Sequence, residues 1–451
     1  MVSLGCAKNL VDAEIMLGET LDGEFELELD PAGADVIIIN TCGFIEEARA
    51  EARMVIHEYS ALKERAGRSP KVVATGCWAE RNPDDLLREF SGLDAVWGLA
   101  TPASLQSAIR DLLDGAGGVS GVGKRTAPRE GPRLLATPPS FAYLRISDGC
   151  DNRCHYCAIP GIRGGLISRR PEAVLEEAKA LADRGVKELV LIGQDSTAYG
   201  RDLGKPGSCL ASLLERLLSA VSVPRIRLLY AHPAHLDERT AELLLAEPRL
   251  CRYLDLPIQH ISDSVLARMG RGYDRERVIA LLDRFGGGRM TIRTTFLLGF
   301  PGESEKDFLQ ALELVRAGRF HHVGAFAYSP EPGTVAYGME STPSAEEAAR
   351  RREAVLEEQS RVAFAWLDSR IGGRESILVD SRPSPGLLIG RSVHEAPEVD
   401  GIIFLPAGGA APGDIVDACV TGRKGYDLMA SPAGGTKRRR QVKKRRKNGY
   451  I

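Results

Sequence analysis

Near the start of the chain, continuous apolar runs alternate with helical stretches. Three of the runs lead into a cysteine: V-S-L-G precedes Cys6, D-V-I-I-I-N-T precedes Cys42 and K-V-V-A-T-G precedes Cys77. Continuous Val and Ile content is typical of buried parallel strands, and residues 9–21 and 44–65 are predicted to be helices. Strands that alternate with helices predict a doubly wound α/β sheet. We therefore expect the three cysteines to meet at its carboxyl edge, where such sheets bind ligands.

A second alternation of strands and helices follows. Helical segments rich in Leu, Ala, Glu and Arg separate most of its six short apolar runs, at 141–147, 187–193, 225–230, 253–258, 291–298 and 322–328. Six strands with helical crossovers predict a partial (βα)6 barrel. Barrels of this kind place their chemistry at the carboxyl ends of the strands.

The pattern changes again after a predicted helix at 344–367. Gly and Pro turns then separate short runs, namely E-S-I-L-V-D-S, G-L-L-I-G-R-S, D-G-I-I-F-L-P and D-I-V-D-A-C-V-T-G. Short strands with such turns predict a small β-barrel of five strands. Such a barrel could dock another molecule or merely cap the preceding domain, and docking is favoured.

These patterns predict an α/β multidomain protein. Gly, Pro, Thr and Ser gather at 113–140, which indicates a linker. The predicted parts are an N-terminal α/β domain at 1–112, the linker, a partial barrel at 141–371, a small β-barrel at 372–433 and a basic tail at 434–451.

Composition and charge narrow the class of protein. The 451 residues are 43% hydrophobic and 27% charged, which suits two or three globular domains. No apolar run approaches the roughly 20 residues that cross a bilayer, and the start lacks a signal-peptide pattern. The nine cysteines are therefore expected to be ligands or buried thiols in a reducing cytoplasm. Nine positive charges lie between Lys437 and Lys447, which predicts either a solvated tail or attraction to RNA phosphates.

Three cysteines gather in the run S-D-G-C-D-N-R-C-H-Y-C-A-I-P, at Cys150, Cys154 and Cys157. Structural zinc sites are closed by four ligands, whereas an iron-sulfur cluster held by three cysteines leaves one iron free. A zinc site completed by His155, or a redox pair, is the alternative. Zinc is disfavoured at the triplet, whereas the sequence alone leaves it open for Cys6, Cys42 and Cys77. The remaining thiols, Cys209, Cys251 and Cys419, lack such spacing and are expected to be ordinary buried cysteines.

The C-x3-C-x2-C spacing, with Tyr156 before the last cysteine, resembles the signature of the radical S-adenosylmethionine (SAM) enzymes. This resemblance implies a partial barrel and a 4Fe-4S cluster on Cys150, Cys154 and Cys157. It also implies that the open iron binds the amino and carboxylate groups of SAM.

The order of the three domains resembles the methylthiotransferase family, whose members carry a three-cysteine module before the SAM barrel and a TRAM-like module after it. Several stretches resemble the members that act on an aspartate of ribosomal protein S-twelve: S-L-G-C-A-K-N-L-V-D-A-E, N-T-C-G-F-I-E-E-A, G-C-D-N-R-C-H-Y-C-A-I-P-G-I-R-G, Y-L-D-L-P-I-Q-H-I-S-D, H-E-A-P-E-V-D-G and G-Y-D-L-M-A. Only four residues precede Gly5, which leaves the natural start of the chain open.

The resemblance implies radical chemistry, since the aspartate β-carbon carries no acidic hydrogen and no leaving group. One-electron cleavage of SAM would give methionine and a deoxyadenosyl radical that removes hydrogen from that carbon. A second 4Fe-4S cluster on Cys6, Cys42 and Cys77 would present or donate sulfur, and another SAM would supply the methyl group. The implied partners are S-twelve or the small ribosomal subunit, and an electron donor such as flavodoxin or ferredoxin.

Residues that contact SAM are harder to assign. Gln194 and Asp195 follow the second barrel strand, where radical SAM enzymes often contact the SAM amino group, but a turn cap explains Asp195 equally well. Gly299 and Gly302 could let the backbone approach adenosine, beside a predicted helix capping box formed by Ser304 and Asp307. The expected SAM contacts are Tyr156, Gln194, Asp195, Gly299 and Gly302, while His232, His235 and His260 are more often structural.

Two rivals stay open at this point. The nearest is a methylthiotransferase of transfer-RNA adenosine, although that branch usually carries V-P-Y-T-R-G after the triplet and Q-S-G-S where this chain has Gln259 to Ser262. The other is a non-catalytic metal-containing RNA-binding protein, which does not explain six barrel strands.

Overall fold

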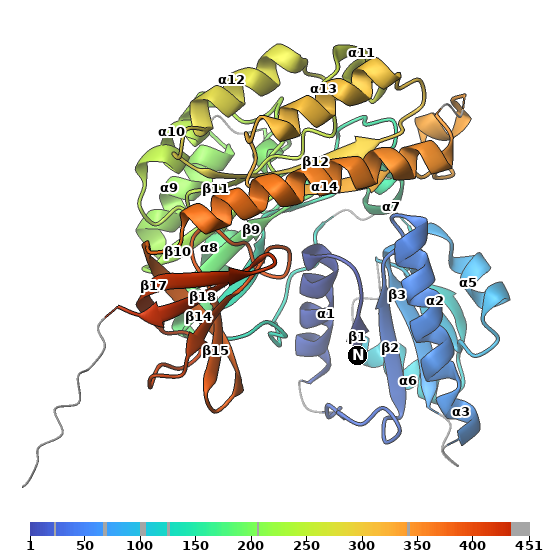
Figure 1. Cartoon of the computed structure of the whole chain (residues 1–451). Helices are drawn as coiled ribbons and strands as arrows, with labels where there is room; N and C mark the ends of the chain where they lie inside the picture. Colours follow the sequence, from blue (N-terminus) through green and yellow to red (C-terminus); the bar gives the residue numbers. More distant parts are fainter. Residues whose placement is uncertain are drawn as a thin grey trace, which may run out of the picture.

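The computed structural model describes residues 1–21, 24–65, 70–99, 105–123, 127–204, 207–340 and 343–433. The predicted basic tail at 434–451 lies outside the described residues. Figure 1 shows an N-terminal α/β unit in blue, a larger α/β unit in green to orange and a small β-barrel in red. No helix of the described part of the chain is long and apolar enough to cross a membrane.

The N-terminal unit is the predicted doubly wound sheet. Helices α1 (Ala7–Thr20) and α6 (Leu105–Leu113) pack on one face. The opposite face is covered by α2 (Glu46–Ser60), α4 (Cys77–Arg81) and α5 (Pro83–Glu89), with α3 (Leu62–Arg65) following α2. All neighbouring strands are parallel, in the order β1 (Val2–Ser3), β2 (Val36–Thr41), β3 (Lys71–Gly76), β4 (Ala95–Trp97) and β5 (Gly118–Ser120).

The stretch predicted to be a linker, 113–140, contributes to this unit. It contains β5, which pairs with β4 as the edge strand. This edge strand has three residues and pairs through its backbone on one side only. Such pairing does not require apolar side chains, so the Gly-rich sequence of the strand looks like that of a loop. Farther along, the backbone N–H of Leu134 donates to the Glu14 carbonyl of α1 at 3.0 Å.

The larger unit is an incomplete barrel, and it confirms the six predicted strands. Two parallel three-stranded sheets form it, joined by an isolated bridge between Ile226 and Leu250. We call these strands the half-barrel: β6 (Phe141–Arg145), β9 (Glu188–Ile192), β10 (Arg225–Leu228), β11 (Tyr253–Asp255), β12 (Thr291–Leu298) and β13 (His322–Ala327). The remaining helices are α7 (Ile159–Arg163), α8 (Pro171–Asp183), α9 (Leu210–Ala220), α10 (Glu238–Ala246), α11 (Asp263–Arg268), α12 (Arg275–Phe285), α13 (Glu305–Arg316) and α14 (Ala345–Ser369).

Alternate residues of the half-barrel strands enter two different cores. Leu144 and Leu191 pack among the outer helices, whereas Tyr143 and Ile192 pack against Val11 of α1. Side chains alternate across a strand, so α1 covers the concave face of the half-barrel. Figure 1 shows α1 on the side of the N-terminal sheet that faces the rest of the molecule.

The C-terminal unit is a closed five-stranded barrel. This confirms the predicted number of strands; four of them were located from the sequence, and the fifth, at the end of the described chain, was not. That strand alternates buried Leu and Ala with exposed residues over only six positions and ends in Pro, which weakens its signal. The strands are β14 (Arg374–Ser384), β15 (Leu387–Arg391), β16 (Ile403–Pro406), β17 (Ile415–Lys424) and β18 (Asp427–Pro432).

Buried ion pairs attach this small barrel to the starts of the half-barrel strands. Glu188, the first residue of β9, binds Arg227 at 2.6 Å and Arg391 of β15 at 3.1 Å. Arg225, the first residue of β10, donates to the Ser376 carbonyl at 2.6 Å. The small barrel therefore closes the end opposite to the carboxyl ends of the strands.

The central carboxylate of this contact has a low pKa. Burial alone would raise the pKa of Glu188, but Arg227, Arg391 and Arg225 outweigh burial and lower it to about 2. Because the folded pKa is below the ordinary value of 4.5, this contribution to stability is complete above about pH 4.5 and is lost as the pH falls toward about 2.

Replacing Glu188 by Gln should destabilise the fold, because Arg227 and Arg391 would lose the carboxylate that they share. Removing one member of a buried ion pair costs about 3–5 kcal/mol, so we expect a clearly lower urea midpoint. The control is Glu215→Gln, whose partner Arg239 is exposed, with an expected change below about 1 kcal/mol. Equal midpoints for the two variants would contradict this role of Glu188.

Candidate active site

The predicted cysteine triplet lies in a loop at the carboxyl end of β6. The short antiparallel pair β7 (Ser147–Asp148) and β8 (Ile167–Ser168) brackets the loop. The backbone N–H of Cys150 donates to the Gly164 carbonyl at 3.1 Å, and that of Cys157 donates to the Cys154 carbonyl at 3.1 Å. Gly149 has φ of +69°, and a Cβ there would lie 1.9 Å from the Gly165 carbonyl oxygen. This close backbone contact fixes the start of the loop.

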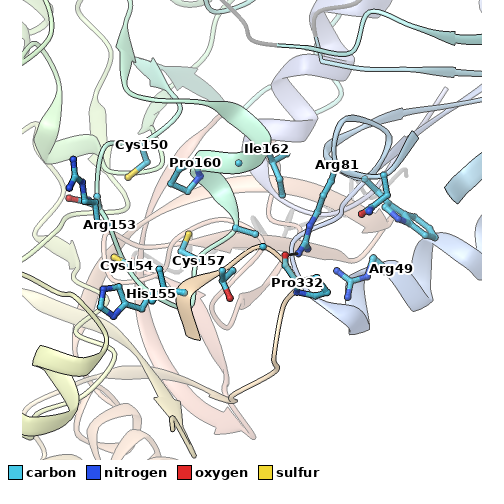
Figure 2. A pocket seen from close by; sticks show the side chains of 18 of the residues that line it. Arg49, Arg81, Cys150, Arg153, Cys154, His155, Cys157, Pro160, Ile162 and Pro332 are labelled. Atoms are coloured by element: carbon cyan, nitrogen blue, oxygen red, sulfur yellow. Dashed lines mark hydrogen bonds between the residues drawn. The ribbon is translucent and has the colours of Figure 1, made fainter. Parts of the chain in front are cut away.

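The triplet lines a cavity of about 1200 Å³. Figure 2 shows its three sulfur atoms on one side of the cavity, with Arg49 and Arg81 of the N-terminal unit on the other. Both arginines bind Glu331, at 2.8 Å each, in the loop after β13. The N-terminal unit and the half-barrel thus form the cavity together.

Cys150 and Cys157 of the triplet are protonated thiols unless a metal binds them. Burial raises the pKa of Cys150 to about 11 and that of Cys157 to about 12. A metal that takes these ligands must displace their protons.

Arg271 contacts the triplet from behind. Its Nη1 donates to Cys154 Sγ at 3.1 Å and to the Tyr156 hydroxyl at 3.0 Å, and its Nη2 donates to the Pro257 carbonyl at 2.9 Å. Sequence reasoning missed this residue, because nothing in R-M-G-R-G-Y indicates that the loop after α11 folds onto the triplet. Tyr156 holds Arg271 and lines neither of the cavities described in this section.

The second set, Cys6, Cys42 and Cys77, is brought to one edge of the N-terminal sheet as the pattern predicted. Cys6 precedes α1, Cys42 follows β2 and Cys77 begins α4 directly after β3. Gly5 has φ of +86°, and a Cβ there would lie only 2.7 Å from Cys42 Cβ. Gly5 therefore lets the segment of Cys6 approach Cys42.

Charge and burial act differently on the thiols of this second set. Burial raises the pKa of Cys77 to about 12. Cys6 is exposed, and although desolvation by neighbouring atoms raises its pKa, the charges of Lys8 and Arg163 outweigh that effect, so its pKa is lowered.

The two sets adjoin. Cys77 packs in one apolar cluster with Ala158 and Ile162, which directly follow the triplet. Arg163 also bridges them, because its Nε lies 3.3 Å from Cys77 Sγ and its Nη1 lies 3.0 Å from Asp148 Oδ1, two residues before Cys150.

The geometry of both sets disfavours a single zinc ion. Two thiolates bound to one zinc at about 2.3 Å lie at most about 4.6 Å apart. In the described part of the chain, only Asp195, His232 and His235 bring three possible ligand atoms within 4.8 Å of one another. Each cysteine set is wider than one ion spans. A set of three soft, spread thiols fits a multinuclear iron-sulfur cluster. His155, the suggested fourth zinc ligand, has Nδ1 only 2.6 Å from the Arg268 carbonyl.

Asp195 lies beside Cys150 in a smaller cavity of about 380 Å³. Its Oδ1 accepts from the N–H of Thr197 at 3.1 Å and so caps the 3-10 turn Ser196–Ala198. Its Oδ2 accepts from Asn152 at 2.8 Å and lies 2.6 Å from His235 Nδ1. The turn cap is real, and the same carboxylate also faces the cavity.

Gln194 donates from Nε2 to Asp148 at 3.1 Å, whereas its buried Oε1 has no hydrogen-bond partner among the described residues. An unpartnered buried acceptor is costly, which is consistent with a ligand that donates to it. Gln194 and Asp195 are thus compatible with SAM binding, and their contact with SAM stays a prediction.

Gly299 and Gly302 serve the packing of the loop after β12. Both have left-handed φ, +74° and +79°. A Cβ on Gly299 would lie 2.1 Å from Ala348 Cβ, and one on Gly302 would lie 2.5 Å from Arg268 Nη1. Neither glycine lines the two cavities, so their contact with adenosine stays a prediction. The predicted capping box of Ser304 and Asp307 is confirmed.

The other singled-out residues have structural surroundings. Cys251 is buried in the core between α1 and the half-barrel, and Cys209 directly precedes α9. Cys419 lies within β17. His260 is fully buried, with Nε2 3.9 Å from Glu303. His232 packs face to face with His235 at 4.9 Å.

Comparison with known proteins agrees with this division of the chain. Residues 144–315 match the model of the Radical SAM superfamily, residues 1–98 that of Uncharacterized protein family UPF0004, and residues 371–432 that of the TRAM domain. The solved structure of the radical SAM methyltransferase TsrM from Kitasatospora setae, with cobalamin and a 4Fe-4S cluster bound, has a TM-score of 0.53 at 17% identity. It covers 91% of this chain and 78% of that one, and shows similarity of fold.

Full-length relatives are more informative. A protein of Desulforudis audaxviator named ribosomal protein uS12 methylthiotransferase RimO is 42% identical, over 95% of this chain and 96% of that protein. A protein of the same name from Trichlorobacter lovleyi is 39% identical, over 95% of this chain and 97% of that protein. The chain therefore belongs to the RimO family of radical SAM methylthiotransferases.

Proposed function

We propose that this enzyme adds a methylthio group to the β-carbon of an aspartate in ribosomal protein uS12, the S-twelve protein of the small subunit. The names of the full-length relatives support this substrate. The observation that carries the proposal is that the two three-cysteine sets adjoin, since Arg163 contacts Cys77 on one side and Asp148, just before the triplet, on the other. The triplet lines the cavity, and Trp78, the neighbour of Cys77, also lines it.

We propose Cys150, Cys154 and Cys157 as ligands of the 4Fe-4S cluster that binds SAM, and Cys6, Cys42 and Cys77 as ligands of a second 4Fe-4S cluster. Thiolates are the usual ligands of such clusters. Three ligands for each cluster leave one iron free, for SAM in the first and for sulfur in the second.

When bound, these groups supply the one-electron chemistry that an unactivated C–H bond requires. The chain's own residues orient the reactants. Arg271 donates to Cys154, and hydrogen bonds to the sulfurs tune a cluster. In this proposal Asp195 accepts from the SAM amino group and Gln194 accepts through Oε1; its support is the Asp195 carboxylate at the smaller cavity and the unpartnered Gln194 Oε1. Tyr156 acts indirectly, because it holds Arg271.

The cavity rim suits an extended protein segment. Arg49, Arg81 and Glu331 close one side of the cavity by ion pairs between the two units. Val335 lines the cavity and is 62% exposed, and the nearby Tyr337 is 55% exposed. A loop of a ribosomal protein can enter the cavity there, and the backbone of the loop can then contact these apolar side chains.

We propose that the C-terminal barrel helps to dock the ribosomal target, as expected of a TRAM domain. Its exposed basic residues include Arg374, Arg382 and Lys424, which can attract RNA phosphates. An electron donor such as flavodoxin or ferredoxin completes the proposed partners. Deleting residues 372–451 would test docking poorly, because Glu188 and Arg227 of the half-barrel would lose buried partners.

The proposal is tested by anaerobic reconstitution with iron and sulfide, followed by reductant, SAM and uS12. Mass spectrometry should find deoxyadenosine and a methylthio mass gain on one aspartate. If deoxyadenosine forms and the methylthio mass gain is found on transfer RNA but not on uS12, the proposed substrate is wrong and transfer RNA is the substrate. Neither product from cluster-loaded protein would overturn the enzymatic assignment.

The two cysteine sets should separate into two activities. Cys157→Ala should abolish SAM cleavage, because the cluster that binds SAM loses a ligand. Cys77→Ala should lose about half of the bound iron and all methylthio transfer, yet still form deoxyadenosine. Cys251→Ala, in the core, is the control and should keep both products. Iron analysis and chromatography of deoxyadenosine measure these outcomes. A Cys77→Ala variant that keeps the iron content of the parent but does not cleave SAM would contradict this division of roles between the two cysteine sets.

Charge reversal on the small barrel should weaken docking without changing SAM cleavage. We expect the triple variant Arg374→Glu, Arg382→Glu and Lys424→Glu to raise the KM for small ribosomal subunits about 10-fold or more. The dependence of KM on salt should also become weaker, because fewer phosphates are neutralised. Reversal of three exposed arginines on the outer helices, Arg216, Arg239 and Arg361, is the matched control. The same KM for both triple variants would contradict docking by the small barrel.

A further inference from the structure

Arg163 occupies an unusual place between the two cysteine sets. It ends α7, six residues after Cys157, and only 2% of its surface is exposed. A buried guanidinium is costly unless its donors and its charge are matched. Here every one of its N–H groups has an acceptor at hand, as the next contacts show.

On the side of the triplet, Arg163 holds the strand that leads into Cys150. Its Nη1 lies 3.0 and 3.3 Å from the two carboxylate oxygens of Asp148. The Asp148 carboxylate also accepts from the N–H of Gly149 at 3.0 Å and from Gln194 at 3.1 Å. A shift of Arg163 would therefore displace Asp148, and with it the backbone before Cys150 and the side chain of Gln194, a candidate SAM contact.

On the other side, Arg163 reaches the N-terminal cysteines. Its Nε donates to Cys77 Sγ at 3.3 Å, and its Nη2 donates to Asn9 Oδ1 at 2.8 Å and to Asp12 Oδ2 at 2.9 Å. Arg163 thus touches one proposed ligand directly and binds α1 through two further residues.

Asn9 extends this contact to the other two cysteines of the set. Its side-chain Nδ2 donates to the Leu4 carbonyl at 3.1 Å and to the Thr41 carbonyl at 2.9 Å. Leu4 lies two residues before Cys6, and Thr41 directly precedes Cys42. One guanidinium and one amide therefore contact the Cys77 sulfur and the backbone close to Cys6 and Cys42.

We propose that Arg163 is a positioning residue that couples the two cluster sites, so that a cluster on Cys150, Cys154 and Cys157 strengthens retention of the cluster on Cys6, Cys42 and Cys77. The inference rests on the proposed function, because it takes the two cysteine sets as ligands of two clusters. A cluster on the triplet would restrict the motion of the segment that carries Asp148. Arg163, which binds Asp148, would then hold Cys77 and Asn9 in place more firmly. By linkage, the coupling is reciprocal.

The test compares cluster retention in reconstituted full-length protein. A ferrous chelator, bathophenanthroline disulfonate, is added anaerobically, and loss of the cluster is followed by absorbance and by iron per chain. Arg163→Lys should lose the cluster on Cys6, Cys42 and Cys77 about 10–100-fold faster than the parent, the range typical of lost outer-shell hydrogen bonds to a metal site. Arg169→Lys is the matched control, a buried arginine that binds Glu130 and Glu177 and contacts neither cysteine set.

Coupling is measured in a cycle with the triple variant Cys150→Ala, Cys154→Ala and Cys157→Ala, which empties the SAM site. In the Arg163 parent, emptying that site should speed loss of the remaining cluster several-fold. In Arg163→Lys, emptying it should change the rate little. Independent, multiplying effects of the two changes would overturn the coupling.

Two further measurements separate positioning from general stability. Asp148→Asn leaves every N-terminal cysteine untouched, yet should weaken retention of their cluster in the same direction as Arg163→Lys. The reduction potential of that cluster, followed by electron paramagnetic resonance, should become more negative in Arg163→Lys, because Cys77 loses an N–H donor. An unchanged potential and unchanged retention, with two clusters present, would overturn this proposal alone. Parent protein that holds only one cluster would overturn the two-cluster assignment as well.

Discussion

The half-barrel does not close, so its concave face must be covered by other parts of the chain, and the rest of the structure depends on this constraint. Six strands leave one side open, and the residues that point into it include Arg145 and Arg227, both fully buried. Buried charges require partners, and other units supply part of them: Asp12 of α1 pairs with Arg145, and Arg227, which pairs with Glu188 of β9, also donates to the loop after β15. The three units are therefore parts of one shared interior.

This shared interior also explains where the chemistry is placed. The small barrel closes the end at which the half-barrel strands begin, so the carboxyl ends stay free for the triplet. Helix α1 carries Cys6 at its start and lies on the concave face, which brings the edge of the N-terminal sheet to the triplet. Contacts needed for folding thus bring the two cysteine sets together, and Arg163 lies where they meet.

The sequence was sufficient for elements with strong local patterns and insufficient for contacts made over long distances. Continuous Val and Ile runs located β2, β3 and the half-barrel strands, and the cysteine spacing located the triplet. The strands β4, β5 and β18 were missed, because they are short and their side chains give little signal. Arg163 and Arg271 were missed for a different reason, since a buried arginine resembles a surface one until its acceptors are known.

The central claim is that this chain holds two neighbouring iron clusters, and anomalous X-ray scattering at the iron edge from crystals of anaerobically reconstituted protein tests it most directly. We predict two iron peaks. One should lie beside Cys150, Cys154 and Cys157, at the cavity of about 1200 Å³, and the other beside Cys6, Cys42 and Cys77. A single peak in fully reconstituted protein, or a second peak away from Cys77, would contradict the account.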